Sequence, residues 1–154
     1  MVRRRAGVWW MAVIEPAGSP NRPKDQSSAA ATRAKPVLGL PKGLVDPGEK
    51  PLETALREVY EETGITSELI TKLGDIKYVY TRAWGDGQRV FKIVSFYLMH
   101  YQSGRIDEIA PEMRIEVARA RWIRLVNAPE LVAYKGEKQI AQRALEYMEK
   151  YSES

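Results

Sequence analysis

The order of apolar and polar positions along the chain predicts a mixture of strands and helices. Residues 6–14 form an apolar run typical of a buried strand, and residues 36–40 form a shorter one. Over residues 76–80 the side chains alternate in character, which indicates a strand with one buried face. Residues 90–99 are apolar on both faces, as expected of a central strand, and residues 118–125 alternate as an exposed or site-facing strand would.

Two segments show helical periodicity instead. In the first, one face of a helix is lined by apolar residues: Leu52, Ala55, Leu56 and Val59. Pro51 suits the first turn of this helix, where a missing N–H costs nothing, and Gly64 suits the left-handed position that ends it. The second helical stripe closes the chain and consists of Ile140, Ala144, Tyr147, Met148 and Tyr151.

The connections between these elements also have recognisable composition. Residues 17–35 are rich in Ser, Pro, Ala and charge, and they read as a flexible loop rather than a linker between domains. Residues 85–87, Gly-Asp-Gly, mark a hairpin turn. Strands and helices in this order predict one α/β domain over residues 1–154, an α/β/α sandwich around a mixed sheet.

Composition limits the chemistry that is available. A chain of 154 residues is one domain, long enough to bury roughly 68–70% of its unfolded surface. The sequence has no cysteine, which excludes disulfides, thiol catalysis and cysteine-ligated metals. Its single histidine, His100, excludes a site that needs several histidines, and we expect a structural or surface role for it.

The net charge of +4 is modest and agrees with anionic substrates. Arginines at positions 3–5 supply much of it, and a frayed terminal tail is the expected structure there. With the apolar residues after them, they imitate a secretory signal, but a buried first strand explains the run better because it is short and stops at Glu15. No segment approaches the ~20 apolar residues of a membrane-spanning helix, so we expect a cytoplasmic protein.

Three glutamates crowd one side of the first helix. Glu58, Glu61 and Glu62 stand at i, i+3 and i+4, which brings their carboxylates together within one turn. Such a cluster is either a solvated acidic face, with Arg57 as the i+4 partner of Glu61, or a metal site. Carboxylates without histidine or cysteine suit Mg²⁺ or Mn²⁺ rather than zinc, and such a cation assists hydrolysis of a phosphoanhydride.

The residues around this cluster resemble a known signature. Residues 43–65 read GLVDPGEKPLETALREVYEETGI, which is similar at every fixed position to the signature of the Nudix hydrolases. The resemblance implies a Nudix-type sandwich in which Glu58 and Glu62 are the main metal ligands and Glu61 a further one. It also implies that Lys42 lends its backbone carbonyl to the metal. Arg57 and Glu49 are then expected to orient the glutamates.

The resemblance leaves the general base open. In some subfamilies the base is a glutamate of the helix, and in others an acid on a later loop. The stretch IDEIAPEMRIEVARARW offers such acids, with Glu116 as the first choice and Glu112 as the second, beside Asp107 and Glu108.

Other residues are candidates for substrate binding. The Leu40-Pro41-Lys42-Gly43 start resembles Nudix enzymes that act on dinucleoside polyphosphates, and Lys42 can place its ammonium on a phosphate or remain a solvated loop lysine. An aromatic ring can stack on adenine for ~1–3 kcal/mol. The remaining candidates for stacking are Tyr78 or Tyr80, which as strand residues more often belong to the core, and Trp84, which is favoured because it lies on the predicted turn. Arg82, Arg89 and Lys92 are candidates for binding phosphates.

Three functions are compatible with the resemblance. The first is Mg²⁺-dependent (or Mn²⁺-dependent) hydrolysis of dinucleoside polyphosphates such as diadenosine tetraphosphate by a monomer or homodimer, with no nucleic acid as partner. The second is a pyrophosphatase for nucleoside triphosphates, oxidised ones included, or for diphosphoinositol polyphosphates. The third is a module that binds a nucleotide without hydrolysis, which the complete set of signature glutamates disfavours.

Overall fold

The structure is a computed structural model that describes residues 1–18, 36–81 and 87–151. Its centre is a five-stranded sheet in the order β3-β4-β1-β2-β5. The strands are β1 (Val2–Arg5), β2 (Val8–Pro16), β3 (Ile65–Thr81), β4 (Arg89–Gly104) and β5 (Val117–Arg124). Strand β1 runs parallel to β4, whereas the other neighbours are antiparallel, so the sheet is mixed.

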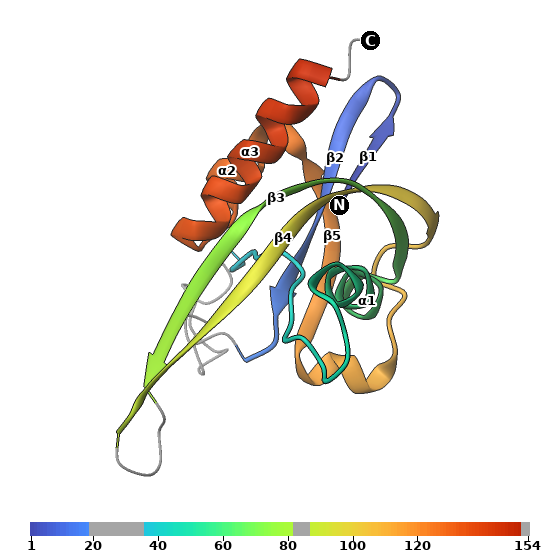
Figure 1. Cartoon of the computed structure of the whole chain (residues 1–154). Coiled ribbons are helices and arrows are strands. Elements are labelled where there is room, and N and C mark those ends of the chain that lie inside the picture. Colours follow the sequence, from blue (N-terminus) through green and yellow to red (C-terminus); the bar gives the residue numbers. More distant parts are fainter. Residues whose placement is uncertain (19–35, 82–86, 152–154) are drawn as a thin grey trace, which may run out of the picture.

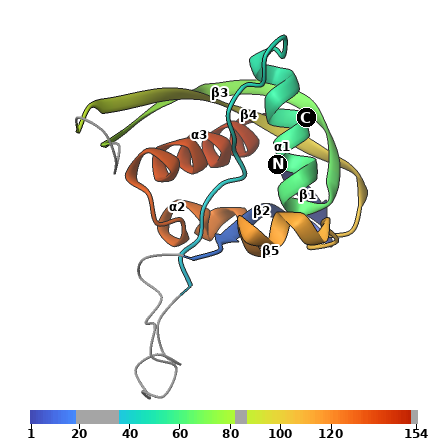
Figure 2. The same ribbon diagram turned by 90° about the horizontal axis from the view of Figure 1, so that it is seen from below.

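Helices cover both faces of this sheet (Figures 1 and 2). The two longer helices are α1 (Pro51–Thr63) and α3 (Lys135–Tyr151), and the shorter ones are η1 (Pro111–Ile115), η2 (Leu125–Asn127) and α2 (Ala128–Leu131). The apolar stripe of α3 packs with Val13 and Leu98 in one buried cluster. The stripe of α1 packs with Ala12 and Met99 in another. The predicted α/β/α sandwich is therefore confirmed.

The predicted limits of α1 are confirmed at both ends. Pro51 stands at the start of the helix, and Gly64 caps its end with φ +84°. The amide of Gly64 donates to the Tyr60 carbonyl at 2.8 Å. At the start, the Glu53 side chain accepts the Lys50 N–H, which satisfies one of the amides that a helix leaves free.

The frayed tail predicted for residues 3–5 is wrong, because these arginines form β1. They pair with Val8 to Trp10 of β2 in an antiparallel hairpin. Ala6 and Gly7 form the two-residue turn, with φ of +51° and +78°, and such turns match the twist of paired strands. The predicted buried strand over residues 6–14 corresponds to β2.

The short strand predicted at residues 36–40 is also wrong. A single bridge joins Gly39 to Ile14 of β2, and no ladder continues from it. The reason lies in the next amides. Leu40 donates its N–H to the carboxylate of Glu137, Pro41 has no N–H, and Lys42 donates to the carboxylate of Glu62. Side-chain carboxylates thus accept the hydrogen bonds that the backbone of a neighbouring strand would accept in a sheet.

Strands β3 and β4 are longer than the apolar pattern predicts. They pair from Ile65 with Gly104 to Thr81 with Arg89, and register shifts between Thr66 and Gly74 bend the ribbon. β4 is interior to the sheet, as predicted. Most of the predicted loop at 17–35 and of the hairpin turn at 85–87 lies outside the described residues. Of the described helices, none has the length and apolar character needed to cross a bilayer.

Candidate functional site

Helix α1 places its acidic residues against the loop that precedes it. Glu58 and Glu62 are buried, at 8% and 5% exposure, whereas the Glu61 side chain is 37% exposed. A solvated acidic face is therefore wrong for Glu58 and Glu62. Two carboxylates this far from water must be stabilised by neighbouring groups or lose their charge.

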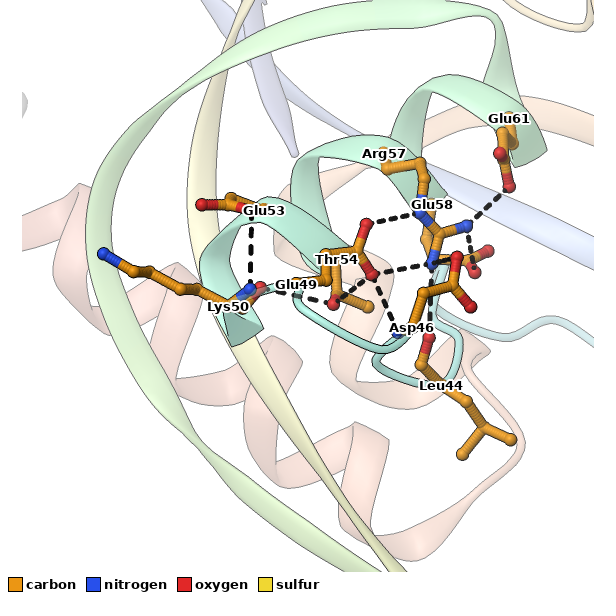
Figure 3. Close-up of polar contacts among 9 residues, drawn as sticks. All are labelled: Leu44, Asp46, Glu49, Lys50, Glu53, Thr54, Arg57, Glu58 and Glu61. Carbon is orange, nitrogen blue, oxygen red and sulfur yellow. Dashed lines mark hydrogen bonds and ion pairs between the residues drawn. The ribbon is translucent and has the colours of Figure 1, made fainter.

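Arg57 connects three of the signature glutamates (Figure 3). Its guanidinium donates to Glu49 at 2.7 Å and to both Glu58 and Glu61 at 3.0 Å. A further bond reaches the carbonyl of Leu44 at 3.2 Å. Because the guanidinium is rigid and planar, these contacts fix the glutamates relative to one another, as the orienting role predicted for Arg57 requires.

Glu49 is fixed in its turn. It accepts hydrogen bonds from the Thr54 hydroxyl at 2.7 Å and from the Asp46 N–H at 3.0 Å, besides those from Arg57. The bond from Arg57, followed by those from Asp46 and Thr54, lowers the pKa of Glu49 to about 2. Glu49 is thus a stable anion that holds Arg57 in place, which supports the predicted orienting role.

The backbone at residues 42 and 43 lies directly against the two buried carboxylates. The Lys42 N–H donates to Glu62 at 2.7 Å. A Cβ at position 43 would overlap the carboxylate of Glu58, so any residue larger than glycine would have to displace that carboxylate. The glycine at the start of the signature therefore serves a close approach between loop and helix.

The electrostatics of the cluster favour protonation. Burial, opposed by the Lys42 N–H and reinforced by the charge of Glu58, raises the pKa of Glu62 to about 8. Burial also raises the pKa of Glu58, against the influence of Arg57. The charge of Glu116 raises the pKa of both residues, so Glu116, just before β5, lies near enough to act on them.

The other acids of that loop differ from Glu116. Asp107 accepts hydrogen bonds from Arg114 at 2.9 Å and from the Ala120 N–H at 2.8 Å, so it braces the turn before β5. These bonds outweigh burial and lower the pKa of Asp107. Glu112 is exposed within η1, and Glu116 rather than Glu112 is among the leading influences on the pKa values of Glu58 and Glu62. The electrostatic influence on Glu58 and Glu62 thus favours Glu116 over Glu112 as the acid from outside the helix.

The donor set fits a hard divalent cation. Two buried carboxylates with raised pKa values gain most from a neighbouring positive charge, and oxygen donors suit Mg²⁺ or Mn²⁺. Within the described part of the chain, no three acidic or histidine side chains are arranged so that they could all coordinate one metal ion. Oxygens of Glu58 and Glu61 accept hydrogen bonds from Arg57. The guanidinium therefore holds these carboxylates near one another, but they are not arranged around a single metal position.

A second group of side chains adjoins the acidic cluster through Lys42. The Lys42 ammonium lies 5.9 Å from the ring centre of Tyr78 and 5.5 Å from that of Tyr134. Lys92, opposite Tyr78 on β4, also lies 5.9 Å from the Tyr78 ring. Lys42 and Lys92, both predicted to bind substrate, therefore lie beside the same ring, that of Tyr78, and Lys42 also lies beside the exposed Tyr134.

Glu137 holds this group together, and sequence reasoning missed it. Although fully buried, it accepts the Leu40 N–H at 2.6 Å, the Tyr78 hydroxyl at 3.0 Å and the Lys42 ammonium at 3.1 Å. Burial and the Glu137 charge raise the pKa of Tyr78, which stays a hydroxyl donor. An available signal was the position of Glu137 three residues before Ile140, on the apolar stripe of α3.

Several predicted substrate residues are not placed. Arg82 and Trp84 lie outside the described residues, and of Tyr80 only the backbone, paired with Val90, is described. Between the two tyrosines that the sequence offered, Tyr78 is the one seen beside Lys42 and Lys92.

Comparison with known proteins assigns this arrangement to a family. A family model for the NUDIX domain matches residues 20–144, which is most of the chain. The chain belongs to the NUDIX family. The resemblance noted at residues 43–65 is thereby confirmed, and in this fold α1 with its preceding loop is the segment that carries the Nudix signature.

Relatives of this Nudix chain carry different activities in their names. It is 35% identical over 133 residues to the mutator-type protein MutT4 of Mycobacterium tuberculosis, which covers 83% of this chain and 51% of that protein. It is 37% identical over 109 residues to an RNA pyrophosphohydrolase of Rhodopseudomonas palustris, covering 62% and 63%. With the asymmetrical bis(5'-nucleosyl)-tetraphosphatase of Mus musculus it shares 32% over 114 residues, covering 70% and 69%. The chain thus spans between half and two thirds of the first two relatives.

Solved structures confirm the Nudix fold. An Ap4A hydrolase of C. elegans in a binary complex superposes with a TM-score of 0.65 at 20% identity, covering 97% of this chain and 93% of the other. The NUDIX domain of Shewanella oneidensis NrtR, complexed with ADP ribose, gives 0.64 at 17% identity, covering 96% and 82%. At this identity the likeness establishes the fold alone.

Proposed function

We propose that this Nudix chain hydrolyses a phosphoanhydride bond in dinucleoside polyphosphates such as diadenosine tetraphosphate, with the help of a divalent cation. The observation that carries the proposal is the pair of buried carboxylates, Glu58 and Glu62, placed beside a group of lysines and tyrosines. Acidic groups suit a metal, and lysines with aromatic rings suit phosphates joined to bases. The name of the Mus musculus relative supports this substrate class.

The cation is Mg²⁺, with Mn²⁺ as the alternative. Glu58 and Glu62 would hold it, together with Glu61 and the carbonyl of Lys42. When bound, the cation neutralises charge on the phosphates and lowers the pKa of a coordinated water. Arg57 and Glu49 keep the ligands in place through the hydrogen bonds already described.

The chain's own residues supply the remaining roles. Glu116 accepts the proton of the attacking water, because its carboxylate is exposed, lies outside α1 and influences the pKa values of Glu58 and Glu62. Lys42 and Lys92 bind phosphate oxygens. The ammonium of Lys42 gives one hydrogen bond to Glu137 and one to the Leu40 carbonyl, so that, as far as the described residues go, its third proton can bind a ligand. Tyr134, which is 43% exposed, offers a ring for a base.

Hydrolysis of a pyrophosphate on RNA is the second candidate. The observation that favours it is the 37% identity to the Rhodopseudomonas palustris RNA pyrophosphohydrolase. The same metal ligands would serve this reaction, because both substrates present a phosphoanhydride next to a nucleotide. The two substrates differ in the rest of the molecule, which is a polynucleotide chain in one case and a second nucleoside in the other.

A substrate panel separates these possibilities. The panel compares kcat/KM for diadenosine polyphosphates, nucleoside triphosphates, oxidised triphosphates, ADP-ribose, diphosphoinositols and an RNA with a 5′ triphosphate. We expect the highest value for diadenosine tetraphosphate. A preference for ADP-ribose or ordinary triphosphates contradicts the proposed substrate, and a preference for the RNA selects the second candidate.

A further inference from the structure

A second cluster of cationic and aromatic side chains lies on the sheet, away from the carboxylates. Arg3 of β1 faces Trp10 of β2, and Trp10 faces Arg124 of β5. The Arg3 guanidinium lies 4.0 Å from the ring centre of Tyr101 on β4, and that of Arg124 lies 5.9 Å from Trp10. Aromatic and cationic groups therefore alternate across four neighbouring strands.

This row lies on the same face of the sheet as α1. Tyr101 and Trp122 pack at the edge of the cluster that α1 buries, and their rings meet edge to face at 6.2 Å. Trp10 is two residues from Ala12 of that cluster and so points to the same side. The β1–β2 hairpin extends beyond α1, which leaves this end of the face uncovered by the helix (Figure 1).

Side chains of this row border a hollow. Its volume is about 310 Å³, and it is lined by Arg3, Arg5, Trp10 and Trp122. That volume falls at the lower end of the range of small-ligand sites. Two indole rings and two guanidinium groups in one hollow are complementary to a ligand that has both a flat ring and an anionic group.

The arginines of this face carry charge that acids do not offset. Among the described residues, none of Arg3, Arg5 and Arg124 forms an ion pair with a carboxylate. Arg57 and Arg114 do so at 2.7 and 2.9 Å. A guanidinium without a carboxylate partner attracts anions, and the attraction is stronger beside aromatic rings because these exclude water.

We propose that this hollow is a nucleotide-binding site separate from the acidic cluster. The base stacks on Trp10 and Trp122, and its phosphate binds Arg3 and Arg5. The ligand is either a free mononucleotide or one nucleotide of a single strand, because both present the same ring and phosphate. The site shares no residue with the metal ligands assigned above, so it does not depend on the proposed function.

The strand alternation provides matched controls. Arg4 and Trp9 are paired with each other and point to the opposite face of the sheet, where Trp9 packs on the cluster of α3. Arg4→Gln therefore removes the same charge from the same strand as Arg3→Gln but leaves the hollow intact. Glu62→Gln serves as a control for binding at the acidic cluster.

The test is a titration with AMP, adenosine, inorganic phosphate and a short single-stranded oligonucleotide. The chain has four tryptophans, so four indole N–H signals report the binding site by NMR. We expect AMP to shift the Trp10 and Trp122 signals and to bind more tightly than adenosine or phosphate. The Arg3→Gln/Arg5→Gln double variant should weaken AMP at least tenfold, while Arg4→Gln and Glu62→Gln stay within twofold of the unmodified protein.

The oligonucleotide identifies the source of the ligand. Tighter binding than AMP, lost in the double variant, indicates a single strand, and equal or weaker binding indicates a free mononucleotide. Equal losses in Arg4→Gln and in the single Arg3→Gln variant would overturn the proposal, because they would show attraction to net charge alone. A dimer in sedimentation that the double variant dissociates would also overturn it, since a second copy of the chain would then occupy the face.

Discussion

At the scale of single residues, the proposed function depends on Glu58 and Glu62. Both carboxylates are buried, yet the fold offers each only partial compensation: Arg57 for Glu58 and the Lys42 N–H for Glu62. If these carboxylates hold the proposed cation, their protonation and the binding of the cation compete for the same oxygens. This competition makes the site sensitive to pH.

The pKa of Glu62 predicts how stability changes with pH. In the folded, metal-free protein this pKa is about 8, above the ordinary value of 4.5. Between these two values the unfolded chain has lost a proton that the folded chain keeps, so stability falls as pH rises from about 4.5 to 8. We expect this fall, on the order of a few kcal/mol, to be smaller in Glu62→Gln.

Urea unfolding at a series of pH values, with and without Mg²⁺, measures this effect. Because Mg²⁺ binds the deprotonated carboxylate, its stabilisation should be larger at about pH 8 than at about pH 6. Identical pH slopes for the unmodified protein and Glu62→Gln would refute the shifted pKa.

Glu137 is predicted to position Lys42. Glu137→Gln keeps the shape of the side chain but removes the charge that holds the ammonium, so KM should rise about tenfold, or ~1.4 kcal/mol, with a smaller change in kcat. In a Lys42→Met background the same change should have little further effect on KM. Tyr78→Phe is the control, because it removes one hydrogen bond to Glu137 and leaves the ion pair. Fully additive effects on KM would show that Glu137 does not act through Lys42.

At the scale of elements, the loop over residues 40–43 determines how the glutamates of α1 are placed. Among the described residues it pairs with no strand. Instead, the N–H groups of Leu40 and Lys42 donate to carboxylates of α3 and α1. Gly43 then lies where a Cβ would meet Glu58. The loop and the two helices are therefore one unit, although they are far apart in sequence.

Gly43→Ala tests this unit. The added methyl group must displace the Glu58 carboxylate, so we expect kcat/KM to fall on the order of a hundredfold, or ~2.8 kcal/mol. Gly48→Ala is the matched control. Gly48 has φ +83° but open space around it, so alanine there should cost about 1 kcal/mol of stability and little activity. Equal activity losses in both variants, measured by steady-state kinetics, would contradict the account.

The same elements show what the sequence could and could not predict. The limits of α1 were predictable because Pro51 and Gly64 act locally, and the signature residues lie on one helix. The arginines of β1 and the loop at 36–40 were misjudged, because partners distant in sequence decide their structure. Glu137 was missed for the same reason: its role depends on groups 59 and 97 residues away.

At the scale of the whole molecule, stability and chemistry are carried by different residues. The buried clusters on the two faces of the sheet consist of apolar side chains, and the signature glutamates belong to neither. We therefore expect the sheet, α1 and α3 to fold without the cation. The family and the fold are evident from the signature and these elements, whereas the substrate depends on side chains around the site.

Removal of the cation should separate folding from activity. With EDTA, we expect turnover to disappear while the far-UV circular dichroism spectrum and cooperative thermal unfolding persist. Added Mg²⁺ should restore turnover. Loss of the cooperative transition in EDTA would mean that the metal site is part of the fold, and activity in EDTA would mean that no cation is needed.

In the proposed function, Glu58 and Glu62 hold a cation which assists phosphoanhydride hydrolysis. The most direct measurement is the Mg²⁺-dependent turnover of diadenosine tetraphosphate by Glu62→Gln and Glu58→Gln, with the fold checked by circular dichroism. We expect losses in kcat on the order of a thousandfold, or ~4 kcal/mol, in well-folded variants. Undiminished turnover in either variant would contradict the proposed function.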